Sequence, residues 1–232
     1  EQESLINLLR LVADACKIPN SRTILNQGSI IDLFSKSYAL PPIPLNFFWE
    51  ATNKLYSPEY IQKFTFQIEA AQTILKQKEI EVIHKYHSES LKLLTKVSDV
   101  DSSFITEDLI RCVLNIMLKF NTSSYFLCEA RNFFKQVIQI KNLQVILVNI
   151  VSPLLLFEAD EKTHGLMSMF SYAIIDDINN GKETKKLLKK IPGASNFIKT
   201  KLNSYNKKLT SEYGQDTNQP ILQIIPKKTN VW

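Results

Sequence analysis

Two histidines in the middle of the chain are the side chains best placed to bind a metal. His84 and His87 are three residues apart, which puts them on one face of a helix, with Glu81 and Glu89 as nearby carboxylates. A zinc site needs three or four ligands in a closed geometry, and no fourth candidate with matching spacing is present. We therefore interpret both as surface histidines and predict that the protein binds no metal and no cofactor.

The acidic pairs do not indicate acid–base catalysis. Asp99 with Asp101, and Asp176 with Asp177, fall where helices are expected to end, and capping or solvation explains them. The sequence has no phosphate-binding G-x-x-x-x-G-K-[ST], no G-x-G-x-x-G, no G-x-S-x-G and no H-E-x-x-H. We predict that the protein is not an enzyme.

The cysteines indicate a reducing compartment. Cys16, Cys112 and Cys128 are odd in number, have no C-x-x-C spacing and fall on apolar faces of expected helices. We expect buried thiols and a cytoplasmic or nuclear protein. The start of the sequence lacks a signal-peptide pattern, and no apolar run reaches the roughly 18–20 residues that span a bilayer, so we predict no transmembrane segment.

Composition favours an all-α fold. Hydrophobic residues make up 44% of the 232 residues, so the chain is rich enough in apolar side chains to fold. It contains only 5 glycines, too few for the many tight turns of a sandwich or a Rossmann unit.

The stretch 18–57 has the clearest pattern of helices and turns. Pro19 suits the first turn of a short helix, and Gly28 suits a sharp turn before a second helix capped by Ser29. The prolines of 41–44 predict a loop, after which apolar residues from Leu45 onward form a third, longer helix.

This stretch resembles an armadillo repeat. The residues that carry the resemblance are Pro19-Asn20-Ser21-Arg22, Ile24-Leu25, Gly28, Ile30 and Leu33. Residues 5–15 resemble the third helix of a preceding repeat, and the good resemblance covers about 4–57. It implies a right-handed α-solenoid of armadillo/HEAT-like repeats whose third helices line a groove.

The resemblance also implies which residues contact a partner. The family often carries an asparagine ladder on its third helices; this chain has Asp14 at one such place and Asn53 at the next. Among the aromatic clusters, Phe47 with Trp49 is the one we expect in the groove. The predicted partner-binding residues are Arg10, Asp14, Trp49, Glu50, Asn53 and Asn149.

The rest of the chain continues as helices. Residues 58–97 predict one long helix or two with a kink near 76–78, and Thr106 opens a helix with acidic residues in its first turn. Residues 125–140 and 143–157 predict a pair, with a kink or restart at Pro153; a strand is the competing interpretation of the β-branched run 145–151. A further helix is expected at 161–177.

These units recur about every forty residues, a period typical of armadillo and HEAT arrays. Each unit must stack on its neighbours to bury its apolar face. We predict one helical domain over 1–208, with a weak break near 98–105.

A basic segment follows. Residues 182–208 contain nine lysines and one acid, against a net charge of +5 for the whole chain. We predict a solvated helical cap; an acidic protein partner, nucleic acid or anionic lipid are the alternatives. The basic patch comprises Lys185, Lys186, Lys189, Lys190, Lys199 and Lys201.

Residues 209–232 predict an extended tail. Its apolar run 221–225 lies between prolines, so it either packs on the domain or binds a partner or a second copy of the chain.

These observations favour a scaffold or adaptor that binds a peptide or helix of a protein partner. The first alternative is a regulatory armadillo-type factor that acts on a small GTPase or on Hsp70, as an exchange factor would. The weaker alternative is binding of nucleic acid or anionic lipid through the basic segment.

Overall fold

The computed structural model describes residues 2–27, 40–161 and 165–207, and every regular element in these ranges is a helix. The side chains of residues 27 and 158–161 lie outside this description. The prediction of an all-α fold is confirmed. The Gly28 turn, the Ser29 cap and the tail 209–232 fall outside the described residues.

Helices follow one another closely in the first half of the chain. Their bounds are Gln2–Ala15 for α1, Ser21–Gln27 for α2, Pro42–Leu55 for α4, Thr65–Leu75 for α5 and Lys85–Ser98 for α6. A 3-10 turn, Pro58–Phe64, precedes α5.

The second half continues in the same way. Its helices are Glu107–Lys119 for α7, Ser124–Val137 for α8, Gln144–Glu161 for α9, Leu166–Asn180 for α10, Lys182–Leu188 for α11 and Ala194–Phe197 for α12. Short 3-10 turns lie at Ser102–Phe104 and Lys141–Leu143, and a π-helical turn lies at Ile198–Leu202.

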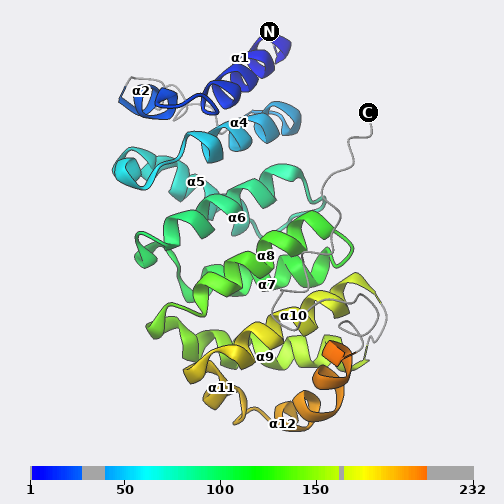
Figure 1. The fold of residues 1–232 in the computed structure, drawn as a ribbon. Coiled ribbons are helices and arrows are strands. Elements are labelled where there is room, and N and C mark those ends of the chain that lie inside the picture. The colour runs from blue at the N-terminus through cyan, green and yellow to red at the C-terminus, as the bar shows by residue number, and fades with distance from the viewer. Residues whose placement is uncertain (1, 28–39, 162–164, 208–232) are drawn as a thin grey trace.

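The helices pack in two layers that extend from α1 at one end to α12 at the other (Figure 1). In one layer α1 contacts α4, α4 contacts α6, α6 contacts α8 and α8 contacts α10. In the other layer α5, α7, α9 and α11 follow one another. Contacts of α5 with α7 and of α6 with α8 cross the expected weak break at 98–105, so the stack continues there.

Capping residues explain where several helices begin. Thr106 begins α7 as predicted, and its side chain accepts a hydrogen bond from the Leu109 N–H. Residues 42–44 of the expected loop are helical instead, because Pro42 opens α4 and Pro44 lies in its first turn, where a missing N–H leaves no bond unmade.

The region 58–97 corrects a second prediction. A break at the expected place separates α5 from α6, but it is a connection over 76–84 and not a kink. His84 and His87 end this connection, because each side chain binds the other's backbone N–H in a capping box at the start of α6.

Residues 145–151 form a helix and not a strand. The helix α9 runs from residue 144 through Pro153 to residue 161 without restarting. Leu147, Val148 and Val151 are buried in it. Val145 in the same run is 49% exposed and Asn149 is exposed, so α9 buries one face and is not enclosed on all sides.

Candidate functional site

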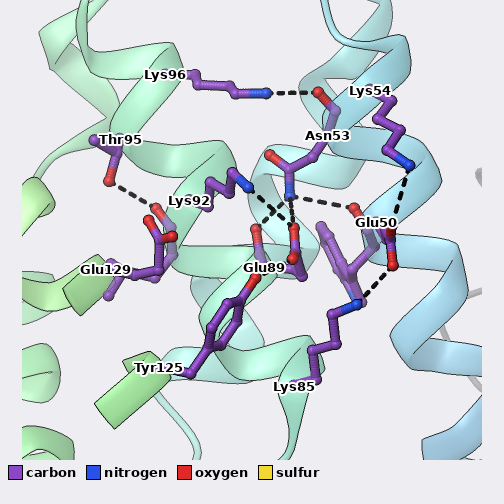
Figure 2. A network of polar contacts seen from close by, with 12 residues as sticks. Glu50, Asn53, Lys54, Lys85, Glu89, Lys92, Thr95, Lys96, Tyr125 and Glu129 are labelled. Carbon is purple, nitrogen blue, oxygen red and sulfur yellow. Dashed lines mark hydrogen bonds and ion pairs between the residues drawn. The ribbon is translucent and has the colours of Figure 1, made fainter. Parts of the chain in front are cut away.

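Glu50 of α4 is the centre of an exposed ionic cluster. Lys54 donates a hydrogen bond to its Oε1 at 3.1 Å, and Lys85 from the start of α6 donates to its Oε2 at 2.6 Å (Figure 2). Partial burial opposes ionisation of Glu50, but the hydrogen bonds from the two lysines outweigh it and lower the pKa to about 2. Glu50 is therefore an anion with both of its oxygens already used.

A hollow of about 240 Å³ lies between α1 and α4 beside this cluster. Three of the predicted partner-binding residues, Arg10, Asp14 and Glu50, line it together. The Arg10 guanidinium lies over the ring of Phe47, 4.6 Å from its centroid. The other lining residues are Leu9, Ala13, Lys17, Phe47 and Lys54.

Charges of both signs face this first hollow. Lys17 binds Asp14 at 2.6 Å, and both side chains are about two-thirds exposed. The hydrogen bond and charge of Lys17 lower the pKa of Asp14, so the carboxylate is ionised at neutral pH. The hollow thus presents a mixed-charge rim over an apolar floor.

A second hollow of about 350 Å³ lies between the start of α6 and the start of α8. Its lining is mostly apolar and hydroxyl-bearing: Ile83, His84, Lys85, Ser88, Ser123 and Tyr125. Because Glu50 lines the first hollow and binds Lys85 of the second, the two hollows are neighbours on one face of the α1–α4–α6–α8 layer.

A network of hydrogen bonds connects the helices beneath this face. The Asn53 amide donates to the backbone oxygen of Glu89 at 2.7 Å and to its Oε2 at 3.0 Å (Figure 2). Tyr125 donates its hydroxyl proton to the other carboxylate oxygen of Glu89. Burial raises the pKa of Tyr125, and the Glu89 carboxylate adds to this effect, so the phenol stays protonated and holds α8 to α6.

Further polar groups continue the network along the same helices. Lys96 donates to the backbone oxygen of Asn53 at 2.6 Å, and burial lowers the pKa of its ammonium group. Burial raises the pKa of Glu129 on α8, which lies beside Lys92 and Lys96. The network connects α4, α6 and α8, and α6 and α8 are the two helices that border the second hollow.

The structure corrects the predicted roles of Trp49 and Asn53. Trp49 has no exposed surface, because α4 packs between α1 and α6 and its central apolar face is enclosed on both sides. Asn53 is 3% exposed, and its amide is used within the protein. Neither side chain can contact a partner on the folded protein.

Asn149 is exposed, as a binding residue must be, but it lies elsewhere. It belongs to α9, which packs on α7, α10 and α11, far along the stack from α4 (Figure 1). It therefore does not join Arg10, Asp14 and Glu50 in one site.

The six lysines of the predicted basic patch are all exposed. The expected single capping helix is instead divided into α11, α12 and the π-helical turn, because Pro192 and Gly193 interrupt it, the latter with φ +79°. Leu188, Phe197 and Leu202 of this segment are buried.

The histidine interpretation is wrong for one residue. His87 is 1% exposed, and burial lowers its pKa to about 4, so it is neutral at physiological pH. No group of three or more potential metal ligands occurs within residues 2–27, 40–161 and 165–207.

The three cysteines are free thiols; Cys16 is buried, and Cys112 and Cys128 are half-buried. Burial raises the pKa of each, which keeps them protonated. In the described part of the chain no single helix is long and apolar enough to cross a membrane; the bent pair of residues 124–137 and 141–157, at 108°, meets that criterion only jointly.

Sequence reasoning missed the contact of Lys85 with Glu50 on the face, and the contacts of Glu89 with Asn53 and Tyr125 beneath it. Lys85 and Glu89 lie on α6 and Tyr125 on α8, and each contact joins residues 35 or 36 positions apart, a separation with no local signal. The recurrence of helical units about every forty residues was the only sequence feature that pointed to such contacts.

Comparison with known proteins gives no relative: the sequence matches no protein-family profile, and neither characterised proteins nor solved structures yield a significant match.

Proposed function

We propose that this protein is a non-enzymatic interaction scaffold, an armadillo-like stack that holds a peptide or helix of another protein across the α1–α4–α6–α8 layer. The observation that carries the proposal is the ion pair of Glu50 with Lys85, which joins two neighbouring hollows on one face. A protein segment that lies across both would place one side chain near Arg10 and another near Tyr125.

The chemistry of the two hollows supports a polypeptide ligand. The first offers Arg10, Lys17 and Asp14 to charged side chains, and the second offers apolar and hydroxyl groups. Neither hollow is enclosed, and each is close to or below the smallest volumes usual for small-molecule pockets, about 300 Å³. Two shallow neighbouring hollows fit the successive side chains of a bound segment.

A charge swap tests the proposal. The Asp14→Lys/Lys17→Asp variant keeps the net charge and the internal ion pair but reverses the pattern that a partner meets. The matched control is Glu107→Arg/Arg111→Glu, which swaps an exposed ion pair on α7 in the other layer.

Tagged wild-type protein and both variants are incubated with native lysate, and captured proteins are quantified by mass spectrometry. We expect one or a few proteins to be held by the wild type and the control but reduced at least about tenfold by the α1 swap. Equal capture by all three, with unchanged melting temperatures, would contradict a partner site at this face.

A further inference from the structure

A separate hollow lies at the opposite end of the stack from α1. It has a volume of about 290 Å³ and is formed between the second half of α9 and the α12 region. Pro153, Leu156 and Phe157 form an apolar wall on the α9 side. The opposite side is mixed, with Pro192 and Phe197 beside Gly193, Asn196, Thr200 and Lys201. The Phe157 side chain is 57% exposed, so this apolar surface is open to solvent.

The segment that forms one side of this C-terminal hollow is rich in lysine, and Lys201 lines the hollow itself. Residues 182–207 contain eight lysines and one acid, Glu183, whose carboxylate is already bound by Lys186 at 2.9 Å. Lys189 and Lys190 directly precede the Ile191-Pro192 turn at the hollow. Glu158, Asp160 and Glu161 follow Phe157 in the sequence, with side chains outside the described residues; with them included, residues 153–207 still carry nine lysines against six acids.

We propose that this end of the protein binds an acidic segment of a partner protein, with one apolar side chain of that segment inserted in the C-terminal hollow. Charge complementarity selects the acidic segment, because the exposed lysines attract it and repel basic sequences. The hollow selects the anchor, since its volume and its Leu156, Phe157 and Pro192 walls suit one or two apolar side chains. This site is independent of the α1–α4–α6–α8 face.

The same residues argue against nucleic acid. Residues 182–207 contain no arginine, the residue best suited to bind phosphate in a bidentate way. The aromatic rings are also engaged: Phe197 stacks on Tyr172 at 5.2 Å between centroids, and Tyr172 stacks on Tyr205 at 4.5 Å. Bases therefore have few free aromatic faces on which to stack.

A membrane surface fits less well than a peptide. Helices that lie on membranes insert a protruding apolar face, whereas the apolar surface here is a concavity. Within the lysine-rich segment Leu188, Phe197 and Leu202 are buried, and Leu187, Ile191 and Ile198 are half-buried. The lysine-rich segment, residues 182–207, thus presents a hollow, with Lys201 in its lining, and no protruding apolar face.

The probe is a phage-displayed library of random peptides of about 16 residues, selected against the full chain. Enriched peptides are then measured by fluorescence anisotropy against three variants. Lys189→Glu/Lys190→Glu reverses charge at the hollow, Asn196→Trp fills the hollow from its exposed lining residue, and Lys78→Glu/Lys141→Glu reverses two exposed lysines elsewhere as the matched control.

We expect enriched peptides to be acidic with one or two apolar residues at a fixed position. Lys189→Glu/Lys190→Glu and Asn196→Trp should each weaken binding at least about tenfold, and the control should bind like wild type. Only the first variant should also reduce the salt dependence of binding, because six of the eight lysines remain. All variants are first checked for an unchanged melting temperature.

Selection of peptides without acidic residues, or equal binding by all variants, would overturn the proposal. So would tight binding of phosphatidylserine vesicles or of a single-stranded oligonucleotide by a chain that enriches no acidic peptide. In the last two cases the lysines would bind a lipid surface or a nucleic acid.

Discussion

Asn53 and Glu89 join two adjacent helices through one amide group. The Asn53 Nδ2 of α4 lies 2.7 Å from the backbone oxygen of Glu89 on α6 and 3.0 Å from its carboxylate. Both residues are buried at 3% exposure, so neither bond is exchanged for a bond to water. These two hydrogen bonds connect α4 to α6 beneath the proposed binding face.

Asn53→Ala is expected to lower the free energy of unfolding by roughly 2–4 kcal/mol, because the backbone oxygen and Oε2 of Glu89 lose their Asn53 donor in a buried site, while Tyr125 still donates to Oε1. Urea denaturation followed by circular dichroism measures the change. Asn7→Ala, at an exposed position of α1, is the control and should change stability by less than about 0.5 kcal/mol. If Asn53→Ala left the free energy of unfolding unchanged, these hydrogen bonds would not hold α4 to α6.

Arg131 of α8 and Asp177 of α10 form an ion pair between these two helices. The Arg131 Nε and the Asp177 Oδ2 are 2.8 Å apart, and the two side chains are 6% and 13% exposed. Arg131→Met should lower the free energy of unfolding by about 3–5 kcal/mol, because Asp177 is left as a nearly buried charge. The double variant Arg131→Met/Asp177→Leu should recover most of that loss. A double variant as unstable as Arg131→Met alone would show that packing, and not the unpaired charge, governs the site.

His87 makes stability depend on pH. Its pKa in the folded protein is about 4, below the ordinary 6.5, so the unfolded chain takes up a proton first as pH falls. The stabilising contribution is therefore complete above about pH 7 and is lost as pH falls from about 6.5 towards 4. Between pH 7 and 5 the loss should be roughly 2 kcal/mol.

Urea titrations of the wild type and His87→Phe over this pH range test that expectation. The difference between their free energies of unfolding isolates His87 from the other titrating groups, including Glu50, whose pKa of about 2 makes it act only below about pH 4.5. A difference that does not vary with pH would show that His87 has an ordinary pKa in the folded protein.

Gly193 is needed for the turn beside the C-terminal hollow. Its φ of +79° lies in the left-handed region, and a Cβ there would meet nothing within 4 Å. Gly193→Ala should therefore cost about 1–2 kcal/mol of backbone strain without any clash, and Gly193→Asn should cost less. Thermal unfolding measures the loss of stability of each variant. Equal losses would indicate that the added side chain, and not the positive φ, causes the destabilisation.

Local signals in the sequence were sufficient for most of the helices. Thr106 with the acids after it predicted the start of α7, and the apolar run around Val148 was correctly assigned to a helix, although only one face of that helix is buried. The prolines at 42 and 44 misled the prediction, because a proline ends a helix in its interior but is tolerated in its first turn.

The side-chain roles were predicted less well. Arg10, Asp14 and Glu50 do meet at one hollow, because the expected helical faces of α1 and α4 are adjacent. Trp49 was placed in the groove and is in the core, since helical spacing does not say which side of α4 its neighbours cover. The partners Lys85, Glu89 and Tyr125 depend on stacking between helices, which no single segment records.

The most direct test of the scaffold proposal is site-specific photo-crosslinking in cells. A photoreactive phenylalanine analogue replaces Lys17 at the first hollow or Ser123 at the second, and Arg111 on the other layer as the control. We predict that positions 17 and 123 crosslink to the same protein, through two places of one contiguous segment, and that position 111 does not. Crosslinks to unrelated proteins, or a shared product only at position 111, would contradict a partner site on the α1–α4–α6–α8 face.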